Sequence, residues 1–92
     1  MIIDVTQIAD DNSADYVYEV KLKPHGYSYK VRLSSEYCQK LTGGKVDGQE
    51  LVKKSFDFLL ENESPESILK EFDLPVISQY YPDYEQEIHS RI

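Results

Sequence analysis

The sequence predicts an α+β domain, in which an antiparallel sheet from the first third of the chain is covered on one face by three or four short helices. Apolar and polar residues alternate with a period of two over residues 15–33, which is typical of half-buried strands. After Leu33 the period changes to 3.6, which is typical of amphipathic helices. No repeat or linker interrupts the 92 residues, so we expect a single domain over residues 1–92.

Two strands around a Pro/Gly turn predict a β-hairpin. Both apolar sets must lie on one face, which requires an even-numbered loop of either residues 25–26 or residues 24–27. Pro24 has no amide hydrogen for the ladder and favours the longer loop. The predicted cross-strand pairs are Leu22 with Tyr29, Val20 with Val31, and Tyr18 with Leu33.

The segment Ile2–Ile8 is a weaker strand candidate that could supply a third antiparallel strand, since a lone hairpin is marginally stable. It is followed by DDNSAD, residues 10–15, which superficially resembles a calcium-binding loop. The twelfth position from Asp10 is Lys21 instead of the glutamate that such a loop needs. The run therefore predicts a solvated turn.

Capping residues mark the first two predicted helices. Ser34 or Ser35 starts a short helix that continues to Leu41 and is stopped by the glycines at positions 43 and 44. Asp47, with Glu50 three residues later, forms a capping-box-like start for the longest helix, which extends to about residue 61. Its apolar face is expected to lie on the core and includes Leu51, Val52, Phe56, Leu59 and Leu60.

Shorter helical segments are predicted in the remaining third. Ser64, Pro65 and Glu66 form a helix start, with a cap, a proline at the first helical position and an acid in the first turn. The apolar face of this helix would comprise Ile68, Leu69 and Phe72. Residues 76–81 predict a short helix before Pro82, and spacing of four predicts a last helix that carries Tyr84, Ile88 and Ile92.

Composition narrows the functional classes. Seventeen acidic residues against 10 basic ones give a net charge of −7, which repels polyanions at long range. A single cysteine favours a reducing compartment, and the first ten residues lack the features of a secretion signal. The longest strongly apolar run has three residues, far below the ~20 that span a bilayer. We therefore expect a cytoplasmic protein with no membrane partner.

No motif in the chain predicts catalysis, a metal site or a cofactor. LTGGK, residues 41–45, has paired glycines but lacks the spacing of a phosphate-binding loop. Cys38, His25 and His89 are too dispersed for a zinc site, and nothing local lowers the pKa of the thiol. We expect no catalytic residues, no cofactor and no metal.

Charge segregation gives one candidate interface. On the hairpin, four bases point away from the apolar face, as a nucleic-acid-binding surface would require, although no aromatic residue lies between them to stack on bases. A solvated outer face that discourages edge aggregation is the simpler explanation. The four bases are Lys21, Lys23, Lys30 and Arg32.

The C-terminal tyrosines give a second candidate interface. Tyrosine makes up 8 of the 11 aromatic residues, and its amphipathic ring suits half-buried surfaces and interfaces. The C-terminal apolar stripe either packs back on the hairpin or docks on a partner. Its candidate partner-binding residues are Tyr80, Tyr81, Tyr84 and Ile88, followed by Ile92.

The stretch SFDFLLENESPESIL, residues 55–69, followed by Tyr80, Tyr81, Pro82 and Tyr84, resembles a pattern of short uncharacterised prokaryotic proteins. The resemblance covers less than half of the chain and implies no activity and no site residues.

These observations favour a non-enzymatic binding or accessory domain that acts through protein–protein contacts, with a protein partner or with a second copy as a homodimer. The first alternative is a small nucleic-acid-associated regulator that uses the basic face of the hairpin. The second is an enzyme with an unrecognised carboxylate site or a site at Cys38.

Overall fold

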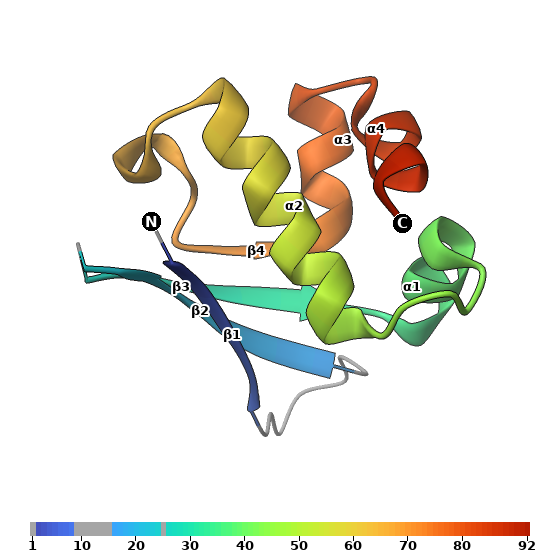
Figure 1. Ribbon diagram of the computed structural model, residues 1–92, viewed down its shortest axis with the longest axis horizontal. Coiled ribbons are helices and arrows are strands. Elements are labelled where there is room, and N and C mark those ends of the chain that lie inside the picture. The colour runs from blue at the N-terminus through green and yellow to red at the C-terminus, as the bar shows by residue number, and fades with distance from the viewer. Residues whose placement is uncertain (1, 9–15, 25) are drawn as a thin grey trace.

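The α+β fold class is confirmed by the computed structural model, which describes residues 2–8, 16–24 and 26–92. Four strands form one mixed sheet in the order β1-β2-β3-β4, and the helices cover one of its faces (Figure 1). The radius of gyration is 12.3 Å. The elements are β1 Ile2–Ile8, β2 Tyr16–Lys23, β3 Tyr27–Leu33, α1 Ser35–Thr42, α2 Gly48–Asn62, β4 Glu71–Asp73, α3 Ile77–Tyr80 and α4 Tyr84–Arg91, with 3-10 turns at Pro65–Ser67 and Leu74–Val76.

The predicted hairpin forms with the expected face buried, but its register differs by two residues. Leu22 lies opposite Tyr27 and Val20 opposite Tyr29, so the predicted pairs are wrong. A shift of two keeps every side chain on its face. It also adds a pair to the buried face, since Tyr16 now lies opposite Leu33. Four residues, 23–26, join the paired positions, and His25 is outside the described residues.

The third antiparallel strand is also present, at the edge of the sheet. Val5 of β1 lies opposite Val20 of β2 and is buried. The carbonyl oxygen of Val5 accepts a hydrogen bond of 2.7 Å from the side chain of Gln49, which anchors the edge strand to the first turn of α2. The DDNSAD turn predicted for residues 10–15 lies outside the described residues.

The first two helices begin at the predicted caps and end within one residue of the predicted positions, at Thr42 and Asn62. Ser34 precedes α1, and its hydroxyl accepts a hydrogen bond of 3.1 Å from the amide of Tyr37. Gly43 ends the helix with φ at 61°, a left-handed conformation that glycine adopts at low cost. Asp47 precedes α2, and its carboxylate accepts a hydrogen bond of 2.9 Å from the amide of Glu50.

The helix predicted from Ser64 is wrong. Only the single 3-10 turn Pro65–Ser67 forms, and the chain then extends into β4, where Phe72 lies opposite Val31 in a parallel pairing with β3. The strand satisfies backbone groups along β3 that a helix would leave unpaired. As a consequence Phe72 is buried while Leu69 is 49% exposed.

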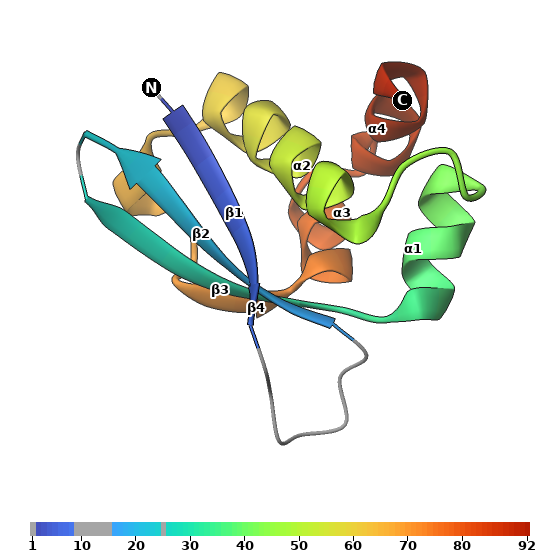
Figure 2. The same ribbon diagram turned by 60° about the horizontal axis from the view of Figure 1, so that its bottom comes forward.

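The core lies between the sheet and α2, which crosses the sheet obliquely (Figure 2). Phe56 of α2 has no exposed surface, as its predicted face requires. Its ring centroid lies 5.1 Å from that of Tyr29 on β3 and 6.2 Å from that of Phe72 on β4. This aromatic cluster connects the central helix to both strands at one edge of the sheet.

Candidate protein-binding groove

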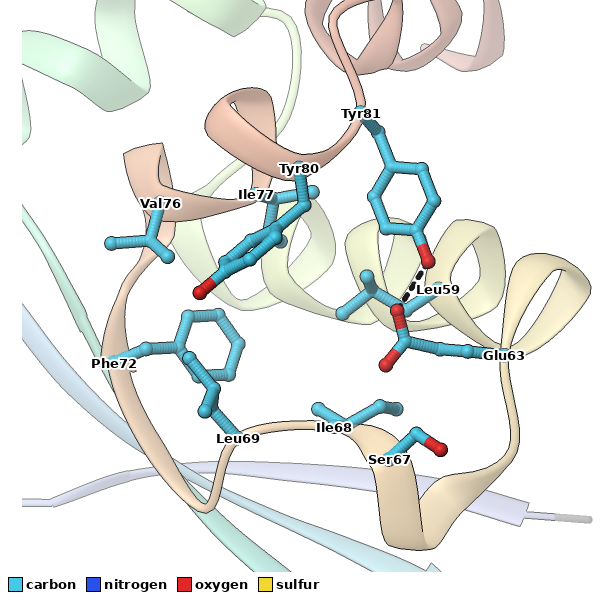
Figure 3. A pocket seen from close by; sticks show the side chains of 10 residues that line it. All are labelled: Leu59, Glu63, Ser67, Ile68, Leu69, Phe72, Val76, Ile77, Tyr80 and Tyr81. Atoms are coloured by element: carbon cyan, nitrogen blue, oxygen red, sulfur yellow. Dashed lines mark hydrogen bonds between the residues drawn. The ribbon is translucent and has the colours of Figure 1, made fainter.

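A groove of about 310 Å³ opens between α2, the segment that follows it, and α3 (Figure 3). Its walls therefore come from three parts of the chain that are separate in sequence. Nine of its ten lining residues are apolar, aromatic or a small serine, and one is a carboxylate. They are Leu59, Glu63, Ser67, Ile68, Leu69, Phe72, Val76, Ile77, Tyr80 and Tyr81.

The groove has a buried floor and an exposed apolar rim. Leu59, Phe72 and Ile77 are each 5% exposed or less, so the floor is part of the packed core. Leu69 and Tyr80 are 49% and 66% exposed. Among the described residues, the large exposed hydrophobic side chains are these two and Ile2, so two of the three gather at this groove.

One polar pair lies within the groove. The Tyr81 hydroxyl donates a short hydrogen bond to Glu63 Oε2, and both side chains are half-buried. This hydrogen bond, with burial, raises the pKa of Tyr81 to about 12, so the hydroxyl stays a donor at neutral pH. Figure 3 shows Tyr81 and Glu63 at one side of the groove, and Leu69 and Phe72 at the other. The groove thus offers an apolar surface next to one oriented carboxylate.

The four predicted partner-binding residues separate into two groups. Tyr80 and Tyr81 line the groove. Tyr84 and Ile88 have no exposed surface, so they are unavailable to a partner and their assignment to a binding surface is wrong. They face inward because α4 packs its stripe on α2, where the Tyr84 hydroxyl lies 2.6 Å from that of Ser55.

The basic outer face of the hairpin is offset by acids. Lys21 lies 3.6 Å from Glu19, and Lys23 lies 3.3 Å from Asp4 of β1. Arg32 contacts Glu71 at 2.5 Å and Asp73 at 2.6 Å, both on β4. Lys30 lies on the same face, opposite Glu71 in the register. Four bases and four acids therefore share this face, a balance that the hairpin sequence could not reveal because β1 and β4 supply three of the acids.

The remaining candidates for chemistry stay apart. Cys38 is half-buried on α1, and burial raises the pKa of its thiol, which opposes formation of a thiolate. His89 is exposed on α4, and His25 is outside the described residues. Within residues 2–8, 16–24 and 26–92, no group of three or more metal-ligating side chains comes together, and no helix is long and apolar enough to cross a membrane.

Sequence patterns missed most of the groove. Leu69 and Phe72 were expected on one helix face, and only the pairing of β4 with β3 separates them into a rim and a floor residue. Glu63 carries no motif, and its role follows from its contact with Tyr81. The clustered tyrosines at positions 80 and 81 were the one local signal that pointed here.

Comparison of the chain with protein-family models, curated proteins and solved structures found no match. The groove is therefore the feature of this protein from which a function can be inferred.

Proposed function

We propose that this protein is a non-enzymatic binding domain that takes an apolar side chain of a protein partner into the groove. The observation that carries the proposal is the grouping of Leu69 and Tyr80, two of the three large exposed hydrophobic residues described, around one concave site with a packed floor. Exposed apolar side chains gathered at a concavity are typical of interaction sites.

The dimensions and chemistry of the groove suit a protein segment. Its volume, about 310 Å³, lies at the lower end of ligand pockets and accommodates one or two apolar side chains. Tyrosine on the rim is typical of residues that contribute most to protein–protein affinity, because its ring buries a large area at little entropic cost. The floor belongs to the core, so the groove is formed before the partner arrives.

The nucleic-acid alternative receives less support. The four bases share the outer face with four acids, and three of these bases, Lys21, Lys23 and Arg32, are in ion pairs. A cytoplasmic location remains part of the proposal, because the single cysteine suits a reducing compartment.

Selection from a random peptide library displayed on phage tests the proposal. Wild-type protein is expected to enrich peptides with a recurrent bulky apolar residue, whereas Leu69→Ser and Tyr80→Ser are expected to lose those peptides. Both side chains are largely exposed, so the fold is expected to survive their replacement. Ile2→Ser is the matched control, since Ile2 is 65% exposed on β1, at the opposite edge of the sheet from β4.

Peptides that bind all four proteins equally would contradict the proposal, as would a failure to enrich any sequence. Light scattering of the wild-type protein tests the alternative that a second copy of this chain occupies the groove. A dimer that Tyr80→Ser converts to monomer would show that a second copy occupies the groove, and would overturn the assignment to a different partner.

A further inference from the structure

The C-terminal end of α2, which forms one wall of the groove, carries acidic residues and no basic one. A helix C-terminus carries a partial negative charge from its unpaired carbonyls, which basic residues in the last turn normally offset. The last turn of α2 has no basic residue, and Glu61 and Glu63 lie at this end instead. Both carboxylates are therefore in a position that opposes the helix dipole.

The negative charge of one of these two carboxylates, Glu61, is offset by a basic residue of the same chain. Arg91 of α4 donates two hydrogen bonds to Glu61, of 2.8 and 2.7 Å, and this contact lowers the pKa of Glu61. A guanidinium that binds both oxygens of a carboxylate in this way offsets its charge directly.

The second carboxylate is left with a neutral partner. Glu63 accepts a hydrogen bond from the Tyr81 hydroxyl, and no ion pair to Glu63 forms among the residues that the structure describes. None of the ten residues that line the groove is basic. The Tyr81 contact holds one oxygen of Glu63 in place beside the apolar surface, as a preformed acceptor for a positive group.

We propose that the partner segment carries a lysine or arginine next to its apolar anchor, and that this cation pairs with Glu63 when the anchor fills the groove. The inference rests on the proposed function and specifies the partner. Residues 34–92 contain 12 acids and 6 bases, so the helical half of the molecule attracts a basic segment at long range.

Two other sources of positive charge fit less well. A single carboxylate is a poor site for Ca²⁺ or Mg²⁺, which take several oxygen ligands. In a second copy of this chain, the hairpin bases Lys21, Lys23 and Arg32 already contact acids of their own protomer. The net charge of −7 on each copy also opposes the approach of one copy to the acidic wall of the other's groove. A separate basic and apolar segment is the occupant that matches both the groove and its carboxylate.

The experiment uses a groove-binding peptide from the library selection and a version in which norleucine replaces its lysine or arginine. Isothermal titration measures both peptides against wild type, Glu63→Gln and Glu36→Gln. Glutamine keeps an oxygen for the Tyr81 hydroxyl, and thermal melts confirm that each variant is folded. Glu36 lies in the first turn of α1, and its replacement makes the same change in net charge away from the groove.

We expect Glu63→Gln to weaken binding of the cationic peptide by about 2- to 5-fold, the range of a partly screened ion pair, and to leave the norleucine peptide unchanged. Glu36→Gln is expected to change neither. Equal loss for both peptides, or no loss for either, would overturn the pairing with Glu63 while the groove remains a binding site. A library selection that enriches no peptide on the wild-type protein would instead overturn the proposed function and this inference together.

Discussion

The Tyr84 hydroxyl lies 2.6 Å from the Ser55 hydroxyl, in the interior between α4 and α2. Ser55 donates its own hydrogen to the carbonyl of Leu51 at 2.8 Å, so the tyrosine is the donor in the contact between the two hydroxyls. Burial raises the pKa of Tyr84, which keeps the phenol protonated. This hydrogen bond joins the C-terminal helix to the central helix inside the core.

Removal of one hydroxyl of this contact is expected to cost less stability than removal of the other. Tyr84→Phe removes one donor and is expected to cost about 1 kcal/mol, since Ser55 keeps its bond to Leu51. Ser55→Ala leaves a buried phenol hydroxyl without an acceptor, and is expected to cost about 1 to 3 kcal/mol. Urea unfolding of both variants and of the double variant measures these free energies. Additive costs would contradict the contact, because coupled residues give a double variant less damaged than the sum.

Phe56 is expected to be the most costly single truncation in α2. Its ring has no exposed surface and contacts Tyr29 and Phe72, so Phe56→Ala opens a cavity between the helix and the sheet. We expect a loss of about 3 to 5 kcal/mol in the free energy of unfolding, measured with urea. Asp57→Ala on the exposed side of the same helix is the control and is expected to change little. A fully stable Phe56→Ala protein would show that α2 buries another face.

Local signals account for the parts of the fold that the sequence predicted. The alternation in β2 and β3 and the caps at Ser34 and Asp47 involve residues close together along the chain. β4 was missed because its three residues pair with a strand about forty positions earlier, and the local pattern at Ser64 and Pro65 favoured a helix start. Tertiary pairing overrode that local preference.

The groove was predictable only in part, for the same reason. The aromatic cluster predicted Tyr80 and Tyr81 as partner-binding residues, but it predicted Tyr84 equally, and Tyr84 is buried. Only the packing of α4 on α2 separates the two groups. Similarly, the bases on the outer face of the hairpin have the sequence pattern of a nucleic-acid interface, but in the structure β1 and β4 place acids beside them. Whether a side chain is exposed depends on tertiary packing. The periodicity of an apolar stripe in the sequence therefore does not show whether that stripe is exposed or buried.

The start of α2 depends on a close approach that only glycine allows. A Cβ atom at Gly48 would overlap the Tyr18 hydroxyl and lie 3.2 Å from the Leu33 side chain. We therefore expect Gly48→Ala to cost about 1 to 3 kcal/mol in urea unfolding, although alanine in a helix is otherwise favourable. Tyr18→Phe removes the overlapping hydroxyl, and in that background Gly48→Ala is expected to cost less. An equal cost in both backgrounds would place the strain elsewhere.

Raised tyrosine pKa values predict a loss of stability in alkali. Burial raises the pKa of Tyr18 from 10.0 to about 12, and the pKa values of Tyr37, Tyr81 and Tyr84 are also raised. Above pH 10 these phenols ionise in the unfolded chain while the folded protein keeps their protons. The unfolded state then binds fewer protons, so stability is complete below pH 10 and falls as pH rises toward 12.

Urea unfolding between about pH 8 and pH 11, together with the tyrosinate absorbance of the folded protein, checks this expectation. Tyr18→Phe removes one of the shifted phenols and is expected to make the decline shallower by up to about 1.4 kcal/mol per pH unit, which corresponds to one proton. Tyr80→Phe is the control, because Tyr80 is 66% exposed. Ionisation of all tyrosines near pH 10 without loss of structure would contradict the burial of these hydroxyls, since each phenolate would then have to be solvated in place.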